Sequence, residues 1–304
     1  MGNPVDYIMA LIDAAVVTYI QQAFGGVSAW LSSQMQTLIS LAIIAYGIAW
    51  IYKLTPNKAH ELFQFFIKAT VIIYITTHWS HYSILVGLFT EVPNEIAGSA
   101  MGSLGGNDPT TMNTLLGDYL DRGLDATAFA FQTSSWGSGI IIGVVLLVST
   151  IVGVMGLLVI IILSKIMLSV LLGFGPIFIF MALFGFTGRM FDTWIQQTLN
   201  YAILPMFAYG VAMVTLPIAI DVINTPDVWT MLKQSLVVMI LAFINWVALK
   251  QVAQMTAGIA GGFSLGDEYR ARRNAYDMGK RFGAGAASLG GGVMSRIPQG
   301  TIRK

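Results

Sequence analysis

The sequence is poor in charge and contains no cysteine. Asp, Glu, Lys and Arg make up only 10% of its 304 residues, whereas soluble domains carry about 25%. Because 56% of the residues are hydrophobic, an ordinary soluble domain is excluded. The absence of cysteine excludes disulfides, thiolate metal sites and cysteine nucleophiles. A formal net charge of +1 says little, so the positions of the charges carry the information.

Long apolar stretches separate these charges and predict membrane-spanning helices. A helix needs about 20 mostly apolar residues to cross a bilayer. The candidate stretches are 38–52 (continuing a run from about residue 28), 62–77, 140–186, 199–220 and 236–249. The sequence therefore predicts an all-α, polytopic transmembrane protein with about five spans.

The N-terminal residues are expected to form an amphipathic helix outside the membrane. Asn3-Pro4 is typical of a helix start, and apolar residues follow at helical spacing. Gly25-Gly26 is expected to end the helix. Since Asp6 and Asp13 are its only charges, the helix is expected to lie on the membrane or against a neighbouring subunit.

The distribution of Lys and Arg predicts the orientation of the chain. Residues 91–138 hold six acids and one base, whereas the chain from Lys250 onward holds nine bases and three acids. The N-terminus is therefore expected outside and the C-terminus inside. The expected segments are an outer helix 1–33, two spans in 34–90, an outer acidic segment 91–138, a three-span core 139–250 and a Gly-rich basic inner tail 251–304.

The apolar run 140–186 is expected to contain a break. The orientation requires one crossing in this run, and that crossing is expected to end near Lys165. Further on, Gly173, Gly175 and Pro176 are expected to end a helix, with flanks too short to cross. We expect a broken or re-entrant element near the inner face, bordered by protein or by a water-filled path. A kinked sixth crossing is the alternative.

Small residues recur at four-residue spacing in the third span. Such a pattern lets helices approach closely, either within the chain or between subunits. Ordinary glycine usage in membrane helices explains the pattern equally well. The residues are Gly139, Gly143, Ser149 and Gly153.

The outer segment contains a helix with an acidic stripe. The helix is expected to start after Asp108-Pro109, and its stripe consists of Asp118, Asp121 and Asp125. A solvated face is favoured over a divalent-ion site. The opposite, apolar face needs a cover, which favours a docking role for this helix.

The inner tail is rich in glycine and in basic residues. It is expected to be flexible and to bind anionic lipid headgroups. Nucleic acid or a cytoplasmic ATPase is a less specific alternative. The basic residues are Arg270, Arg272, Arg273, Lys280 and Arg281.

No motif for catalysis or for a cofactor is present. The chain lacks a P-loop, an HExxH pair and a GxSxG elbow. His78 and His81 near the outer end of the second span are interpretable as metal ligands or pH sensors. Interfacial histidines are common, however, and no further ligand is expected near them. We expect no enzyme activity, no cofactor and no metal.

The segment after the break resembles a known family. Residues 171–207 read LLGFGPIFIFMALFGFTGRMFDTWIQQTLNYAILPMF. They resemble the signature region of the TrbL/VirB-type polytopic inner-membrane subunit of type IV secretion systems, the sixth VirB component. Residues 251–262 also resemble the segment that follows the family's last span. The matching positions in the first segment are Gly175, Pro176, Phe184, Phe191, Trp194, Leu199, Tyr201 and Pro205.

The resemblance implies a role in conjugation or secretion. It implies a channel or platform in the bacterial inner membrane that moves DNA or protein, takes part in pilus or stalk assembly, and forms a homo-oligomer. The implied partners are a stalk or minor pilin subunit, periplasmic bitopic subunits and inner-membrane ATPases. On this interpretation Trp194 either anchors a short inner loop at the headgroups or fills a subunit interface.

Two other functions remain open from the sequence. One is a self-contained small-solute transporter that uses the broken helix as its site, although the first half of the chain lacks the paired break common in such transporters. The other is an assembly scaffold that conducts no substrate.

Overall fold

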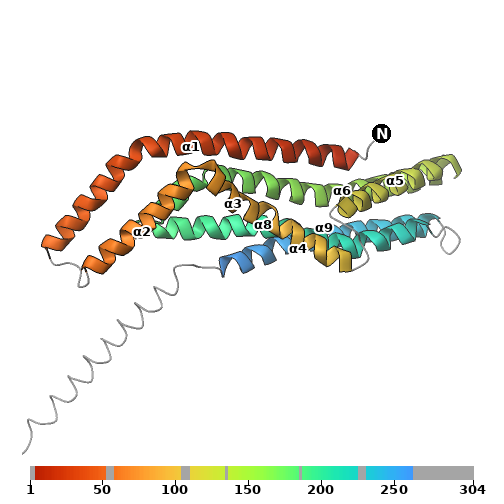
Figure 1. The fold of residues 1–304 in the computed structure, drawn as a ribbon. Helices are drawn as coiled ribbons and strands as arrows, with labels where there is room; N and C mark the ends of the chain where they lie inside the picture. Colours follow the sequence, from red (N-terminus) through yellow and green to blue (C-terminus); the bar gives the residue numbers. More distant parts are fainter. Residues whose placement is uncertain are drawn as a thin grey trace, which may run out of the picture. The chain divides into compact units, whose positions relative to one another are not determined.

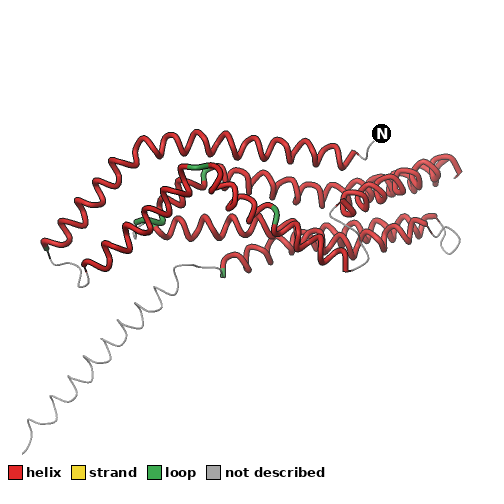
Figure 2. Tube along the Cα trace, in the orientation of Figure 1, coloured by secondary structure: helices red, strands yellow, loops and turns green. Residues whose placement is uncertain are grey.

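The chain is described by a computed structural model over residues 4–52, 58–103, 110–133, 136–184, 187–224 and 231–262. All regular structure in these residues is α-helical, joined by short non-helical segments (Figure 2). The basic residues of the tail lie outside the described residues. The helices are α1 (Pro4–Ile51), α2 (Lys58–Thr77), α3 (Trp79–Thr90), α4 (Val92–Ser103), α5 (Thr110–Thr133), α6 (Trp136–Gly173), α7 (Gly175–Met181), α8 (Gly188–Asn224) and α9 (Met231–Gly261).

Helix α1 is longer than the sequence suggested. The expected stop at Gly25-Gly26 is wrong, because one helix of 48 residues runs through this pair. Glycine is tolerated in helices within apolar surroundings, where no water competes for the backbone hydrogen bonds. Figure 1 shows that α1 bends part-way along its length. Its N-terminal part packs along α6, with Val5 and Met9 buried in the same core as Leu157 and Ile161.

Four of the described helices are long and apolar enough to cross a membrane. They are Pro4–Gln34, Gly139–Gly173, Gly188–Asn224 and Met231–Gly261. A shorter apolar helix, Phe63–Thr77, lies at the second expected span. The prediction of a polytopic helical membrane protein is therefore confirmed, although the first candidate lies nearer the N-terminus than expected.

The break in the long apolar run is where the sequence predicted it. Helix α6 ends at Gly173, and α7 begins at Gly175. The short flank 166–172 is not a separate element, whereas the end of the membrane crossing near Lys165 stays a prediction. Helix α6 continues for 38 residues without interruption as far as the break, because neither glycine nor proline occurs between Lys165 and Gly173.

Helix α6 is the centre of the bundle and contacts α1, α5, α8 and α9. Helices α5, α6, α8 and α9 meet near Gly153 of α6. The Asn245 amide of α9 donates to the Gly153 carbonyl at 3.3 Å and accepts from the Thr215 hydroxyl of α8 at 3.0 Å. The ring of Tyr119 from α5 lies where a Gly153 side chain would begin, 3.0 Å from that Cβ position. Glycine at this point lets the helices approach closely.

Helix α5 lies antiparallel along the first half of α6. Phe131 of α5 covers Gly143, and Tyr119 of α5 covers Gly153. Leu116 and Tyr119 are 0% and 1% exposed. The apolar face of the acidic helix, which needed a cover, is thus covered by α6 of the same chain.

A second hydrophobic cluster joins α1 and α2 to α7, the short helix that follows the break. It brings together Leu31 of α1, Phe65 and Ala69 of α2, Phe180 of α7, and Leu183 just after α7. Helices α1, α2 and α7 therefore form a packed group of their own, and the break lies between this group and the bundle around α6.

Candidate functional site

The helix break leaves backbone carbonyls without partners from their own helix. The last four carbonyls of any α-helix lack an intrahelical donor. At the end of α6, Phe174 leaves the helical conformation with φ −90° and ψ 1°. Pro176 then occupies the first turn of α7, where its missing N–H costs nothing.

Side chains from two other helices satisfy these carbonyls. The indole Nε1–H of Trp194 in α8 donates to the Leu171 carbonyl at 2.9 Å. The hydroxyl of Tyr82 in α3 donates to the Leu172 carbonyl. Trp194 is 3% exposed and Tyr82 is 0% exposed, so both donor side chains are buried. We call this set of contacts the capped break.

The glycines on either side of Phe174 make room for the caps. A Cβ on Gly175 would collide with the Tyr82 hydroxyl and would lie 3.1 Å from the Trp194 ring. A Cβ on Gly173 would lie 2.8 Å from the Cβ of Ala23 in α1. Glycine is therefore required here for close packing, because α1, α3 and α8 all reach the break.

Aromatic rings surround the capped break. Trp194 stacks on Phe178 of α7, with ring centroids 6.0 Å apart, and on Phe191, at 5.8 Å. Tyr82 stacks on Phe24 of α1 at 4.7 Å. Trp194 is thus enclosed by rings of its own chain and donates to a backbone carbonyl. The sequence did not predict these contacts, and the expected roles as a headgroup anchor or at a subunit interface stay predictions.

The other aromatics of the matching segment lie elsewhere. Phe184 packs on Phe180 in the second cluster, which joins α1, α2 and α7, with ring centroids 5.6 Å apart. Tyr201 lines a neighbouring pocket. Of the four aromatics that the sequence singled out, the structure brings together only Phe191 and Trp194.

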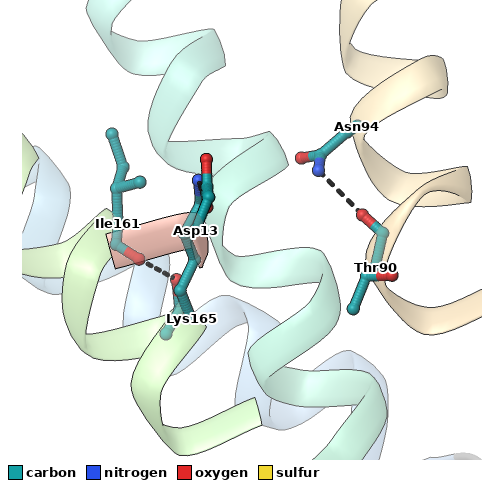
Figure 3. Close-up of polar contacts among 6 residues, drawn as sticks. Asp13, Thr90, Asn94, Ile161 and Lys165 are labelled. Atoms are coloured by element: carbon teal, nitrogen blue, oxygen red, sulfur yellow. Dashed lines mark hydrogen bonds and ion pairs between the residues drawn. The ribbon is translucent and has the colours of Figure 1, made fainter. Parts of the chain in front are cut away.

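A polar pocket of about 300 Å³ lies beside the capped break, among α1, α3, α4, α6 and α8. It contains an ion pair: the Lys165 ammonium donates to Asp13 Oδ1 at 2.6 Å. Figure 3 shows this pair together with Thr90 and Asn94, which also line the pocket. The sequence reasoning missed this site, because it treated Asp13 and Lys165 as separate interfacial charges. The available signal was the presence of two acids in α1 and a single base in α6, two otherwise apolar helices.

The remaining predicted residues lie away from this region. In the third span Gly139, Gly143, Ser149 and Gly153 are all buried, and Gly143 and Gly153 contact α5 of the same chain. The carboxylates of Asp118, Asp121 and Asp125 are on the exposed face of α5.

The histidines do not form a metal centre within the described residues, where no group of three or more His, Cys, Asp and Glu converges. His81 stacks on Tyr74 with centroids 4.0 Å apart, and His78 lies 6.0 Å from His81. His78 occupies the non-helical position between α2 and α3.

Comparison with known proteins agrees with these features. The model of the family described as TrbL/VirB6 plasmid conjugal transfer protein matches residues 39–252, more than half of the chain. The type IV secretion system protein VirB6 of Bartonella quintana (strain Toulouse) is 23% identical over 301 residues, which cover 95% of this chain and 85% of that protein. Both matches are to a component of a secretion system rather than to a class of enzymes. The partners of such a subunit are other components of the secretion system. The chain belongs to the TrbL/VirB6 family and is a multi-pass membrane subunit of a type IV secretion system.

Proposed function

We propose that the chain is a channel or platform subunit in the bacterial inner membrane that helps to move DNA or protein substrates. We also propose that it forms a homo-oligomer and takes part in pilus or stalk assembly. Family membership supports a place in the secretion machine. The capped break is the observation that supports the proposed role in moving substrates.

A break in an apolar helix has an energetic cost, because it leaves backbone carbonyls in need of other donors. An uninterrupted helix satisfies its own carbonyls, whereas the end of α6 depends on Trp194 and Tyr82 from other helices. An uncapped carbonyl in apolar surroundings costs several kcal/mol. The break therefore couples three helices: when α3 or α8 shifts, the end of α6 either follows or loses a hydrogen bond. Such a coupled element suits a subunit that changes conformation during transfer.

The exposed acidic face of α5 supports the assembly role. Asp118, Asp121 and Asp125 are exposed, while the opposite face is buried on α6. We propose that this face is periplasmic and docks a stalk or bitopic subunit, with the N-terminus periplasmic and the C-terminus cytoplasmic. The basic tail would then meet cytoplasmic ATPases or anionic lipid.

The variant Gly175→Ala tests the capped break. Its new methyl group displaces the Tyr82 hydroxyl, so we expect substrate transfer to fall at least tenfold while the protein still inserts and accumulates. The matched control is Gly210→Ala, because a Cβ at Gly210 meets no atom within 4 Å. Wild-type transfer by Gly175→Ala, or an equal loss in the control, contradicts the proposal.

Photo-crosslinking separates a channel from a platform. Crosslinkers at Phe191, beside the break, and at Asp121, on α5, are activated during transfer. Capture of DNA or substrate protein at Phe191 supports a channel, whereas capture of secretion subunits only supports a platform. If neither position captures a secretion subunit or a substrate, the proposed function is wrong.

A further inference from the structure

The polar pocket beside the capped break has a composition that suggests a ligand. Ionisable side chains within membrane-spanning helices are rare and mark functional sites by default. Asp13 and Lys165 lie in two of the candidate spans, and their side chains are 55% and 21% exposed. The pocket contains the ion pair of Asp13 and Lys165 and a second carboxylate, Glu91. Its volume of about 300 Å³ is at the lower end of the range for small-ligand sites.

Hydrogen-bond acceptors remain available in the pocket. Asp13 binds Lys165 through Oδ1 only, and 55% of the Asp13 side chain is exposed. Asn94 uses its amide nitrogen to donate to the Thr90 carbonyl at 2.7 Å, which leaves its amide oxygen as an acceptor. With Glu91, the pocket thus offers two carboxylates and one amide oxygen. A primary ammonium carries three N–H donors and matches such a set.

The pocket also offers one cation. The Lys165 ammonium has three N–H donors, of which one reaches Asp13. The remaining donors suit a phosphate oxygen, which binds ammonium groups strongly. Two carboxylates against one ammonium leave an excess of one negative charge. A ligand with only a phosphate charge is therefore disfavoured, and a zwitterion with an ammonium and a phosphate is favoured.

Most of the remaining lining is apolar, and part of it is exposed on a candidate membrane span. Val16, Ile20, Phe89 and Leu168 line the pocket. Val17 also lines it and is 54% exposed on α1, within one of the candidate membrane spans. A ligand with acyl chains can therefore place its headgroup in the pocket while its chains stay in the bilayer.

We propose that this pocket binds a phospholipid whose headgroup carries a primary ammonium, such as phosphatidylethanolamine. The carboxylates of Asp13 and Glu91 and the amide oxygen of Asn94 accept from the lipid ammonium, and Lys165 binds the phosphate. The lipid thereby bridges α1, α6 and the α3–α4 connection next to the capped break. The binding proposal does not rest on the proposed transport function.

Native mass spectrometry of the purified full chain tests this proposal. The protein is equilibrated with equal amounts of phosphatidylethanolamine, phosphatidylcholine and phosphatidylglycerol, and the retained lipid is counted. We expect the ethanolamine lipid to be retained about tenfold over the choline lipid, whose quaternary ammonium has no N–H donor. We expect a similar preference over the anionic glycerol lipid. Equal retention of the ethanolamine and choline lipids overturns the proposal.

Two variants with a matched control locate the site. Glu91→Gln keeps the ion pair and should reduce the preference for the ethanolamine lipid about tenfold, since a neutral amide accepts from the lipid ammonium more weakly than a carboxylate does. Asp13→Asn should reduce it at least as much. Glu95→Gln is the control, because Glu95 is exposed one turn further on and does not line this pocket. An equal loss in Glu95→Gln and Glu91→Gln refutes the assignment.

A competition experiment distinguishes a lipid from a soluble headgroup. Soluble phosphoethanolamine carries the same charges but no acyl chains, so a large molar excess should leave the bound lipid in place. If it displaces the lipid as effectively as fresh phosphatidylethanolamine does, the pocket is a site for a soluble zwitterion and the lipid assignment is wrong.

Discussion

Replacing Trp194 by Phe removes one hydrogen bond from the capped break while keeping an aromatic ring in place. The indole N–H donates to the Leu171 carbonyl at 2.9 Å, and the side chain is 3% exposed. Phenylalanine has no N–H, so the Leu171 carbonyl loses this donor. Leaving a buried acceptor unsatisfied costs about 1–3 kcal/mol, whereas interhelical bonds in membranes average about 0.6 and reach about 1.7 kcal/mol.

The smaller ring adds a packing loss to this cost. Trp194 stacks on Phe178 and Phe191, and Phe fills less of that space. A loss of about 2 kcal/mol in total is expected, which corresponds to roughly a thirtyfold change in the unfolding equilibrium. The free energy of unfolding is measured by denaturant titration in mixed micelles. The control is Trp30→Phe, because Trp30 is 56% exposed and should change stability by no more than about 0.5 kcal/mol.

The two tryptophan variants decide whether the cap stabilises the break. If Trp194→Phe destabilises the protein no more than Trp30→Phe, the hydrogen bond to the Leu171 carbonyl contributes nothing, and the break does not depend on α8. A loss well above 3 kcal/mol would show that Trp194 makes further contributions, because one hydrogen bond and part of a ring cannot account for it.

Three further predictions concern the bundle and its orientation. Asn245→Leu and Thr215→Val should show a coupling of about 0.5–1.5 kcal/mol in a double-mutant cycle of unfolding, because their side chains share a 3.0 Å bond; additive losses would contradict the contact. Ala23→Cys with Gly173→Cys should form a disulfide on oxidation, since the Cβ positions lie 2.8 Å apart and need to separate by only about 1 Å; no crosslink would place α1 elsewhere. Ser288→Cys in the tail should react with a membrane-impermeant thiol reagent only after the cells are opened, and labelling of intact cells would reverse the orientation.

Local chemistry made the break predictable. Gly173, Gly175 and Pro176 act on the backbone of their own segment, so their effect is readable without knowledge of the fold. The apolar face of α5 was readable for the same reason, from residues at helical spacing. Gly25-Gly26 led to a wrong prediction, because a glycine pair ends a helix in water but not necessarily in apolar surroundings.

Contacts between distant residues were not predictable from the sequence. Asp13 and Lys165 are 152 positions apart, and nothing in either helix specifies the register that pairs them. The same holds for Tyr82, which lies 90 positions from the carbonyl that it caps. Trp194 was singled out by the family resemblance, but its role as a donor to a broken helix requires the relative placement of α6 and α8.

The polar contacts of α6 explain how its neighbours find their register. Burial of apolar side chains favours protein contacts little over lipid contacts, so small and polar residues must position membrane helices. Helix α6 has such contacts at three levels. The Gly153 carbonyl accepts from Asn245 of α9, which itself accepts from Thr215 of α8. Lys165 binds α1, and the carbonyls of Leu171 and Leu172 accept from α8 and α3. The first two levels hold the bundle together irrespective of the break. A movement of α7 relative to α6 therefore disturbs the third level first, while Lys165 keeps α1 on α6. This makes the capped break the part of α6 that can change while the bundle stays intact.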